Sequence, residues 1–316
     1  MKKIFWISKG NVALAVEEIL SVTERKEYKL VGDLVIVDCD SVDFSRLAFT
    51  RAVYEFLFSC RAKDLISGMK TFDWQAEYKK NFKLEIHHTK DFTEKDLAVH
   101  IYDSIKNPKV KMENPFTKFD LFFEDNYVIA GKLLFENKEN LDERRAHLRP
   151  EHHPSSMHPK LARALINLTG IEKGKLYDPF CGSGGILIEA GFMGLEPVGY
   201  DIDEEMLRKA KKNLEFYKIK KFAIKKQDAT KINHKIDFLA TDVPYGRGTK
   251  KINCEELYLK FLLNLKKILR GRAVIMFPHF VNYKKLIKKA KLKIKKEFSI
   301  YVHHDLTRKI AVVEKR

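Results

Sequence analysis

Cysteine is scarce in this sequence, and its few occurrences are scattered. The four cysteines among 316 residues are Cys39, Cys60, Cys181 and Cys254. Because no two of them form a Cys-x-x-Cys pair, the pattern predicts neither a cysteine zinc site nor a disulfide framework. Unpaired cysteines are typical of a reducing compartment, so we expect a cytoplasmic protein. The neighbouring histidines His152, His153 and His158 stand beside prolines, which favours turn or cofactor contacts, and no metal is expected.

Long apolar runs are also absent. No stretch of about 20 apolar residues occurs, which argues against a membrane-spanning helix. The segment Met1–Ile7 has a basic start but lacks the longer apolar core of a signal peptide, and we interpret it as a first strand. Glutamine occurs only at Gln75 and Gln227, a scarcity found in heat-adapted proteins. With 45% hydrophobic and 33% charged residues, the composition indicates a globular chain of two or three domains.

Acidic residues are depleted in only one half of the chain. The formal net charge is +17, yet residues 1–150 hold 25 basic and 25 acidic side chains, so the whole surplus lies in residues 151–316. A dense basic surface favours a polyanionic partner, because phosphates bound by Lys and Arg release counterions. The alternative is a lysine-rich surface that only keeps the protein soluble. We favour a nucleic-acid partner.

The front half predicts two small α+β units followed by a linker. In residues 1–55 we expect a strand at 3–7, a helix after Asn11, a β-rich run at 30–37 and a helix at 44–58. In residues 56–135 we expect strands at 82–87, 110–112, 119–123 and 127–135, with a helix at 95–105. Residues 136–150 are almost entirely polar, which predicts a linker.

Residues 151–316 alternate between strand and helix patterns. The expected helices are 160–169, 186–193 and 204–217, and the expected strands are 175–177, 197–200, 222–225, 236–240 and 273–277. The last two runs, 298–303 and 309–313, predict a closing antiparallel hairpin. This alternation predicts a doubly wound α/β sheet.

A glycine turn follows the first strand of this sheet. The segment from Asp178 to Gly185 reads Asp-Pro-Phe-Cys-Gly-Ser-Gly-Gly, and glycines let a ligand approach the backbone closely. Asp201 follows the next strand, where an acid reaches ribose hydroxyls, and Asp228 is placed to accept a hydrogen bond from an adenine amine. A dinucleotide dehydrogenase shares this outline, but a carboxylate at Asp178 disfavours a pyrophosphate and suits a cation. S-adenosylmethionine carries a sulfonium and an ammonium group, so we expect it as the cofactor.

A second polar loop follows the apolar strand at 236–240. It reads Thr-Asp-Val-Pro-Tyr-Gly from Thr241 to Gly246. The exocyclic amine of a nucleobase is a poor nucleophile, and a carboxylate such as Asp242 can accept its hydrogens and its proton. Pro244 restrains the loop so that backbone carbonyls project inward, and Tyr245 offers a ring for base stacking. The loop therefore predicts methylation of an exocyclic amine.

Together these motifs resemble a known family. The segment Arg149–Arg163, the Asp178 motif and the Asp242 motif closely resemble the archaeal tRNA guanosine-10 N2-methyltransferases, which are Rossmann-like S-adenosylmethionine enzymes. Residues Val110–Pro115 and Asp125–Gly131 are similar to the end of a THUMP domain. The resemblance implies a ferredoxin-like domain at 1–55, a THUMP domain at 56–135 that binds tRNA, the linker, and a Rossmann-like methyltransferase domain at 151–316.

The motifs and the resemblance give a set of candidate site residues. For the cofactor these are Asp178, Pro179, Phe180, Cys181, Gly182, Ser183, Gly184, Asp201, Ile202, Asp228, Ala229 and Asp242. For catalysis they are Asp242, Pro244 and Tyr245, and for RNA they are Tyr245, Arg247, Lys250, Lys251 and Arg149. One residue departs from the family, whose catalytic motif usually has two prolines where this chain has Val243 and Pro244.

The predicted activity is transfer of one or two methyl groups to guanine N2 in tRNA, at guanosine 10. Three alternatives remain at this stage. One is a THUMP-type enzyme acting at another tRNA site or on rRNA, and a second is a DNA amino-methyltransferase, which does not usually carry a THUMP-like front. The third is a tRNA-binding module without catalysis, which Val243 favours and the four aspartates disfavour. No membrane and no particular protein partner are predicted.

Overall fold

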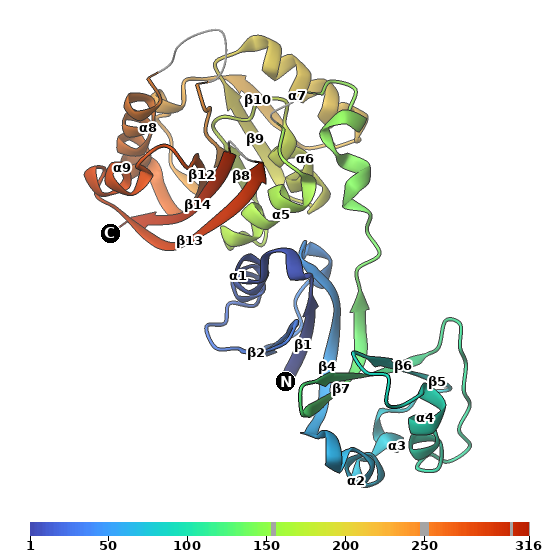
Figure 1. Cartoon of the computed structure of the whole chain (residues 1–316). Coiled ribbons are helices and arrows are strands. Elements are labelled where there is room, and N and C mark those ends of the chain that lie inside the picture. Colours follow the sequence, from blue (N-terminus) through green and yellow to red (C-terminus); the bar gives the residue numbers. More distant parts are fainter. Residues whose placement is uncertain (153–155, 247–252, 304–305, 316) are drawn as a thin grey trace. The chain divides into compact units, whose positions relative to one another are not determined.

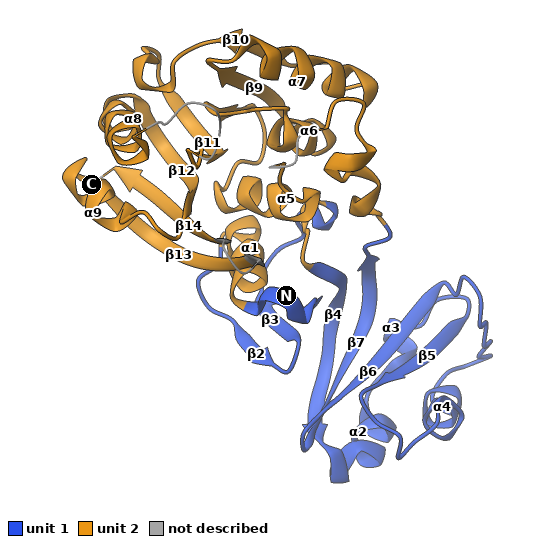
Figure 2. Cartoon of the chain, turned by 45° about the horizontal axis from the view of Figure 1, so that its top comes forward, with its two compact units in different colours: residues 1–12, 25–45, 50–138 blue, residues 13–24, 46–49, 139–316 orange. Residues whose placement is uncertain are grey.

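The computed structural model describes residues 1–152, 156–246, 253–303 and 306–315, without the side chains of residues 302, 303 and 306. The chain forms two compact units, coloured blue and orange in Figure 2. Unit 1 comprises residues 1–12, 25–45 and 50–138, and unit 2 comprises residues 13–24, 46–49 and 139–316. These divisions differ from the predicted domain boundaries, because short N-terminal segments belong with the C-terminal half.

One seven-stranded sheet runs through unit 1 in the order β2-β3-β1-β4-β7-β6-β5 (Figure 1). Its strands are β1 (Lys2–Ile7), β2 (Lys29–Val31), β3 (Leu34–Asp38), β4 (Thr50–Arg61), β5 (Phe82–His87), β6 (Thr117–Glu124) and β7 (Tyr127–Glu136). Neighbouring strands are antiparallel except β5 and β6, which run parallel. Because β4 pairs with both β1 and β7, the two predicted α+β units share a single sheet.

Three helices accompany this sheet: α2 (Leu65–Thr71), α3 (Trp74–Glu77) and α4 (Glu94–Tyr102). Thr93 begins α4 with a capping box in which Thr93 and Asp96 exchange hydrogen bonds. The helices bury an aromatic core around Trp74, Phe82 and Phe119, all fully buried. This core gives unit 1 its own hydrophobic centre.

The helix expected over residues 44–58 is wrong. Only the short 3-10 turn Phe44–Arg46 is helical there, and β4 begins at Thr50. Apolar residues fall at so many positions of this segment that both periodicities fit, and its aromatic and β-branched content favours a central strand paired on both edges. The strand expected at 110–112 is reduced to one isolated bridge between Val110 and Phe82.

Unit 2 contains a second seven-stranded sheet in the order β10-β9-β8-β11-β12-β14-β13. Its strands are β8 (Lys175–Asp178), β9 (Glu196–Asp201), β10 (Ala223–Lys226), β11 (Ile236–Asp242), β12 (Leu269–Pro278), β13 (Leu292–His303) and β14 (Leu306–Lys315). The first five in the sheet order are parallel, and β13 and β14 form the expected antiparallel hairpin, with β14 against β12. The strand order reverses between β8 and β11, and ligands of such sheets bind at this switch point.

Helices cover both faces of the unit 2 sheet. They are α1 (Val12–Thr23), α5 (Pro159–Leu168), α6 (Gly185–Phe192), α7 (Glu204–Phe216), α8 (Cys254–Ile268) and α9 (Tyr283–Lys289). Alternate residues of β12 enter two cores: Ile275 packs in the cluster with α8 and α9, and Met276 packs in the cluster with α1, α5 and α6. The predicted doubly wound α/β arrangement is confirmed for this unit.

Helix α1 belongs to unit 2 through a buried polar contact. Glu18 is fully buried and accepts hydrogen bonds from the backbone N–H groups of Ala48 (2.9 Å) and Phe49 (3.0 Å) and from Asn167 Nδ2 (2.8 Å). Burial raises the pKa of Glu18, and the three donors oppose that rise. Segments from the N-terminal region are therefore built into the C-terminal unit.

The segment predicted as a linker is packed at its second half. Within residues 139–150, Arg144 is buried and its guanidinium pairs with Glu189 (2.7 Å) and Glu139 (2.8 Å). Arg163 of α5 pairs with the same two carboxylates.

Among the described residues, none of the helices is long and apolar enough to cross a membrane.

Candidate active site

Three aspartates end three neighbouring strands of the unit 2 sheet. Asp201, Asp178 and Asp242 are the last residues of β9, β8 and β11, which lie side by side in that order. Because these strands are parallel, the three carboxylates share one edge of the sheet. Asp228 follows two residues after β10 at the same edge. This placement agrees with the sequence-based expectation.

The glycine turn after β8 is locked to β9. Gly182 and Gly184 have φ values of 49° and 87°, a region that favours glycine. Gly182 N–H donates to Asp201 Oδ2 (3.0 Å), and Cys181 N–H donates to the Tyr200 carbonyl (2.9 Å). A Cβ at Gly182 would meet nothing within 4 Å, so the backbone is open to a ligand there.

Asp178 is the most buried of the three carboxylates, with 2% exposure. Its Oδ1 accepts hydrogen bonds from Thr241 Oγ1 (2.6 Å) and from Phe180 N–H (3.2 Å). Burial raises the pKa of Asp178 to about 7, and the charges of Asp201 and Asp242 add to that rise. The strand ends therefore hold more negative charge than their surroundings balance, and a cation bound there would relieve it.

The carboxylates of Asp201 and Asp228 accept hydrogen bonds from backbone N–H groups of the turns in which they lie. Asp201 Oδ1 accepts from Asp203 N–H (3.0 Å), and its pKa is raised mainly by burial. Asp228 Oδ1 accepts from Thr230 N–H (2.8 Å), and its Oδ2 lies 3.8 Å from Lys231. A carboxylate has about four lone-pair positions, so both residues keep capacity for ligand hydroxyl or amine groups.

The other predicted cofactor residues fall into two groups: apolar side chains that are at least partly exposed, and buried residues. Ile202 is 64% exposed, a large apolar side chain open at the sheet edge, and Phe180 is half-buried against Phe261. The remaining ones are buried and offer mainly backbone: Pro179, Cys181, Ser183, Gly184 and Ala229. Burial raises the pKa of the Cys181 thiol, which argues against a nucleophilic thiolate and for packing.

The loop after β11 holds Asp242 between two partners. Asp242 is 19% exposed; Tyr245 donates its hydroxyl hydrogen to Oδ1 (2.5 Å), and Arg308 Nη2 lies 3.6 Å from Oδ2. Burial raises the pKa of Asp242 to about 6, while Arg308 and the Tyr245 hydrogen bond oppose the rise. A carboxylate with such a pKa is ionised at neutral pH and is basic enough to accept a proton.

The neighbouring residues Val243 and Pro244 fix the loop to the elements around it. The carbonyl of Pro244 accepts from the hydroxyl of Tyr258 (2.5 Å) in α8, which anchors the loop to that helix. Val243 is 1% exposed in the adjoining core, and its N–H donates to the Met276 carbonyl (3.2 Å). Proline has no N–H, so valine at this position extends the bonding between β11 and β12.

Sequence reasoning missed three residues that shape the site. Thr241 holds Asp178, Arg308 of β14 faces Asp242, and Tyr258 anchors the loop. A signal exists for Thr241, which is a polar residue directly after the apolar run 238–240. Arg308 has no comparable signal, because only the closing hairpin carries it to the end of β11.

The structure describes only some of the residues that were predicted to contact RNA. Arg149 is 4% exposed, and its Nε donates to the Arg144 carbonyl (3.0 Å). A buried guanidinium does not meet an RNA phosphate, so the contact predicted for Arg149 is corrected. Arg247, Lys250 and Lys251 lie outside the described residues.

Of the histidines near the start of α5, the structure describes the contacts of His158. His158 Nδ1 accepts from Lys160 N–H (3.1 Å) at the start of α5, and its Nε2 contacts Asp142 (2.9 Å). These contacts fit the predicted turn role. His153 lies outside the described residues.

The sheet order, the glycine turn after β8 and the Asp-Val-Pro-Tyr loop after β11 define a Rossmann-like methyltransferase. A crystal structure of TrmN from Thermus thermophilus shares the fold, with a TM-score of 0.51, 18% identity and full coverage of both chains. The RMKL-like methyltransferase domain family matches residues 146–310. A DNA methylase family matches residues 1–212, a range that ends before Asp242.

Two full-length relatives identify the family more closely. A tRNA (guanine(10)-N2)-dimethyltransferase from Methanothermobacter thermautotrophicus is 34% identical over 85% of this chain and 84% of its own length. A protein of the same name from Pyrococcus abyssi is 32% identical over 94% of this chain and 92% of its own length. The chain belongs to the tRNA (guanine(10)-N2)-dimethyltransferase family.

Proposed function

We propose that this chain methylates the exocyclic N2 of guanosine 10 in tRNA, once or twice, with S-adenosylmethionine as the cofactor. The observation that carries the proposal is Asp242, a carboxylate with a pKa of about 6 held at a strand end beside the glycine turn. The names of the two relatives supply the nucleotide position. S-adenosylmethionine, when bound, supplies the methyl group.

The residues at the sheet edge fit this cofactor by charge and shape. Asp178 and its neighbouring carboxylates suit the cationic groups, Asp201 suits ribose hydroxyls, and Asp228 suits the adenine amine. Gly182 leaves the backbone open to the ligand, and the exposed side chain of Ile202 offers an apolar surface for the adenine ring.

Asp242 performs the acid–base part of the reaction. Its carboxylate accepts a hydrogen from the guanine amine, localises the nitrogen lone pair and then takes the released proton. Tyr245 and Arg308 hold the carboxylate in position from two sides. The Pro244 carbonyl accepts from Tyr258 and keeps a second lone pair, so it remains a candidate second acceptor for the amine.

Positive charge would hold the RNA backbone, while Tyr245 of the catalytic loop offers its ring to the target base. The surplus of +17 lies entirely in residues 151–316, which suits a phosphate backbone. We assign the ferredoxin-like and THUMP domains to the N-terminal region, where they would choose the nucleotide, and we place the protein in the cytoplasm. A guanine inside folded tRNA must leave its stack to reach Asp242.

One assay tests this function. Purified protein is incubated with S-adenosylmethionine and a tRNA transcript, and methylated nucleosides are mapped by mass spectrometry. We expect N2-methylated guanosine at position 10, and loss of the product when guanosine 10 is replaced by adenosine. Methylation that persists in the replaced transcript overturns the assignment.

The DNA methylase match to residues 1–212 motivates a second substrate in the same assay. Duplex DNA should remain unmethylated under conditions in which tRNA is modified. Methyl incorporation into DNA alone would favour a DNA amino-methyltransferase, and tRNA binding without incorporation would favour an inactive binding module.

A further inference from the structure

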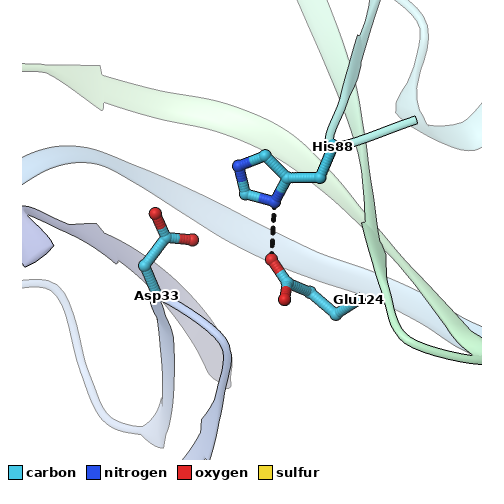
Figure 3. Close-up of side chains that lie close together, drawn as sticks. All are labelled: Asp33, His88 and Glu124. Carbon is cyan, nitrogen blue, oxygen red and sulfur yellow. Dashed lines mark hydrogen bonds and ion pairs between the residues drawn. The ribbon is translucent and has the colours of Figure 1, made fainter. Parts of the chain in front are cut away.

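Three polar side chains from distant parts of the sequence converge in unit 1 (Figure 3). Asp33 lies in the turn between β2 and β3, His88 directly follows β5, and Glu124 ends β6. One ligand atom from each side chain lies within 4.8 Å of the other two. His88 Nδ1 and Glu124 Oε1 are 2.6 Å apart, and the Asp33 carboxylate faces them.

Asp33 is a buried carboxylate without hydrogen bonds. It is 2% exposed, and among the described residues neither of its oxygens has a hydrogen-bond partner. Its one recorded ion pair is with Lys9 Nζ, 3.8 Å from Oδ2, on a side chain that is 72% exposed. Burying a carboxylate without donors is costly, and in the described part of the chain no cation lies within hydrogen-bond distance of Asp33.

The backbone brings Glu124 close to the Asp33 turn. A Cβ added at Gly32 would lie 2.0 Å from Glu124 Oε2, so only glycine leaves room for that carboxylate. The φ of Gly32 is 58°, which glycine adopts readily. The Glu124 carboxylate therefore lies against the turn that carries Asp33.

A neighbouring cluster shows what a compensated group looks like. Glu85, His87 and Asp120 also have ligand atoms within 4.8 Å of one another. There, both Glu85 oxygens pair with lysines, Lys83 at 2.8 Å and Lys118 at 2.7 Å. Asp120 Oδ1 contacts His87 (2.6 Å) and lies 3.8 Å from Lys118, although its Oδ2 has no hydrogen bond. Two lysine ammonium groups contact Glu85 closely in this cluster, whereas Lys9 lies 3.8 Å from Asp33.

We propose that Asp33, His88 and Glu124 form a divalent transition-metal site that binds zinc. One imidazole nitrogen and two carboxylates are a donor set that Zn²⁺ accepts, whereas Mg²⁺ and Ca²⁺ prefer oxygen ligands alone. Bonds of about 2.0–2.2 Å place tetrahedral ligand atoms roughly 3.4 Å apart, so small side-chain shifts suffice. Three protein ligands leave the fourth position to water.

The site would act as a staple within unit 1. Zinc bound there joins the β2–β3 turn to the ends of β5 and β6, which are far apart along the chain. Any ligand that binds only the folded state raises its stability by mass action. The site is independent of the methyl-transfer proposal, because every ligand belongs to unit 1.

The test uses the full-length protein after treatment with a chelator. Zinc is added in slight excess, free metal is removed, and bound zinc is measured by elemental mass spectrometry. We expect one zinc per chain, retained in millimolar Mg²⁺, and a thermal unfolding temperature that rises on addition of zinc. A chain that binds no zinc overturns the proposal.

Matched variants decide which residues bind. His88→Asn suits the backbone, because φ is 67° at this position and asparagine tolerates that region. It should weaken zinc binding at least about 100-fold, and Asp33→Asn at least about 10-fold. The control His87→Asn, in the neighbouring cluster, should bind zinc as the wild type does.

The metal-free proteins provide a further readout. Without zinc, Asp33→Asn should unfold at the same temperature as the wild type or higher, because among the described residues no hydrogen bond to the Asp33 oxygens is lost. With zinc, only the wild type and the control should gain stability. Unchanged zinc binding in both Asp33→Asn and His88→Asn, or loss of binding in His87→Asn alone, would place the metal elsewhere and overturn the proposal.

Discussion

Asp178 in unit 2 accepts hydrogen bonds from Thr241 and from the Phe180 backbone, whereas Asp33 in unit 1 has no hydrogen-bond partner among the described residues. Both carboxylates are 2% exposed. The difference lies in what surrounds them: the adjacent strand β11 and the glycine turn supply donors to Asp178, while Asp33 faces an imidazole and another carboxylate. The two donors partly compensate the charge of Asp178, which suits a cationic cofactor that binds and leaves. Asp33 has no such donors, which suits a metal ion that stays bound.

The largest expected effect comes from removing the catalytic carboxylate. Asp242→Ala should lower kcat for methyl transfer by about 10²–10⁴-fold, the range of general acid–base catalysis. Cofactor affinity should fall much less than kcat, because Asp178 and Asp201 remain at the sheet edge. Single-turnover kinetics and equilibrium cofactor binding separate the two, and an unchanged kcat contradicts the assignment.

Asp178→Asn should weaken S-adenosylmethionine binding and stabilise the fold. In the wild type, the folded pKa of about 7 exceeds the usual 3.8, so this group lowers stability as pH rises through that window. At pH 8 the variant removes a penalty on the order of a few kcal/mol, and the Asn amide oxygen can still accept from Thr241. Its thermal advantage should be largest at pH 8 and shrink towards pH 5.

The same pKa predicts the pH dependence of wild-type binding. Because a cation prefers the ionised carboxylate, affinity for S-adenosylmethionine should be about tenfold weaker at pH 6 than at pH 8. Calorimetry at both pH values measures this ratio. Asp178→Asn should bind weakly at both, and an equal pH slope in the variant would assign the titration to another group.

Thr241→Val makes Asp178 more like Asp33 by removing a donor. Loss of a buried hydrogen bond to a charged group should destabilise the protein by about 1–3 kcal/mol at pH 8. The pKa of Asp178 should rise further above about 7, which moves the pH midpoint of cofactor binding upward. Thr241→Ser keeps the hydroxyl and serves as the control, and equal midpoints in Val and Ser variants contradict the role of Thr241.

Arg308 sets the acid limit of activity. Arg308 opposes the rise in the Asp242 pKa. In Arg308→Gln the acidic limb of the plot of kcat/KM against pH should therefore shift its midpoint upward from the expected value near pH 6. Arg308→Lys retains the charge and should shift the profile less. A pH profile that is unchanged in Arg308→Gln would remove Arg308 from the site.

The smallest effect is expected at Val243. Val243→Pro restores the family's two prolines but deletes the N–H that donates to Met276, so stability should fall by about 1 kcal/mol. Thermal unfolding measures the loss, and Val243→Ala, which keeps the N–H, separates the hydrogen bond from side-chain packing. Stability equal to the wild type would mean that the hydrogen bond contributes little.

Most of unit 2 was predictable because its signals are local. The positions of Asp178, Asp201 and Asp242 at strand ends follow from short apolar runs that each end in an acid. For residues 44–58 the helix prediction was wrong. Ten of these fifteen residues are apolar, so the segment fits either period, and pairing on both edges decided for strand β4.

The sequence by itself determined the alternation of unit 2, the glycine turn, the acids at the strand ends and the one-sided charge, because each depends on neighbours along the chain. Only the tertiary structure decided that α1 joins unit 2, that Arg308 faces Asp242, and that Asp33 meets His88 and Glu124. The physical reason is that strand pairing and burial bring these groups together across long separations, and burial then sets their charge.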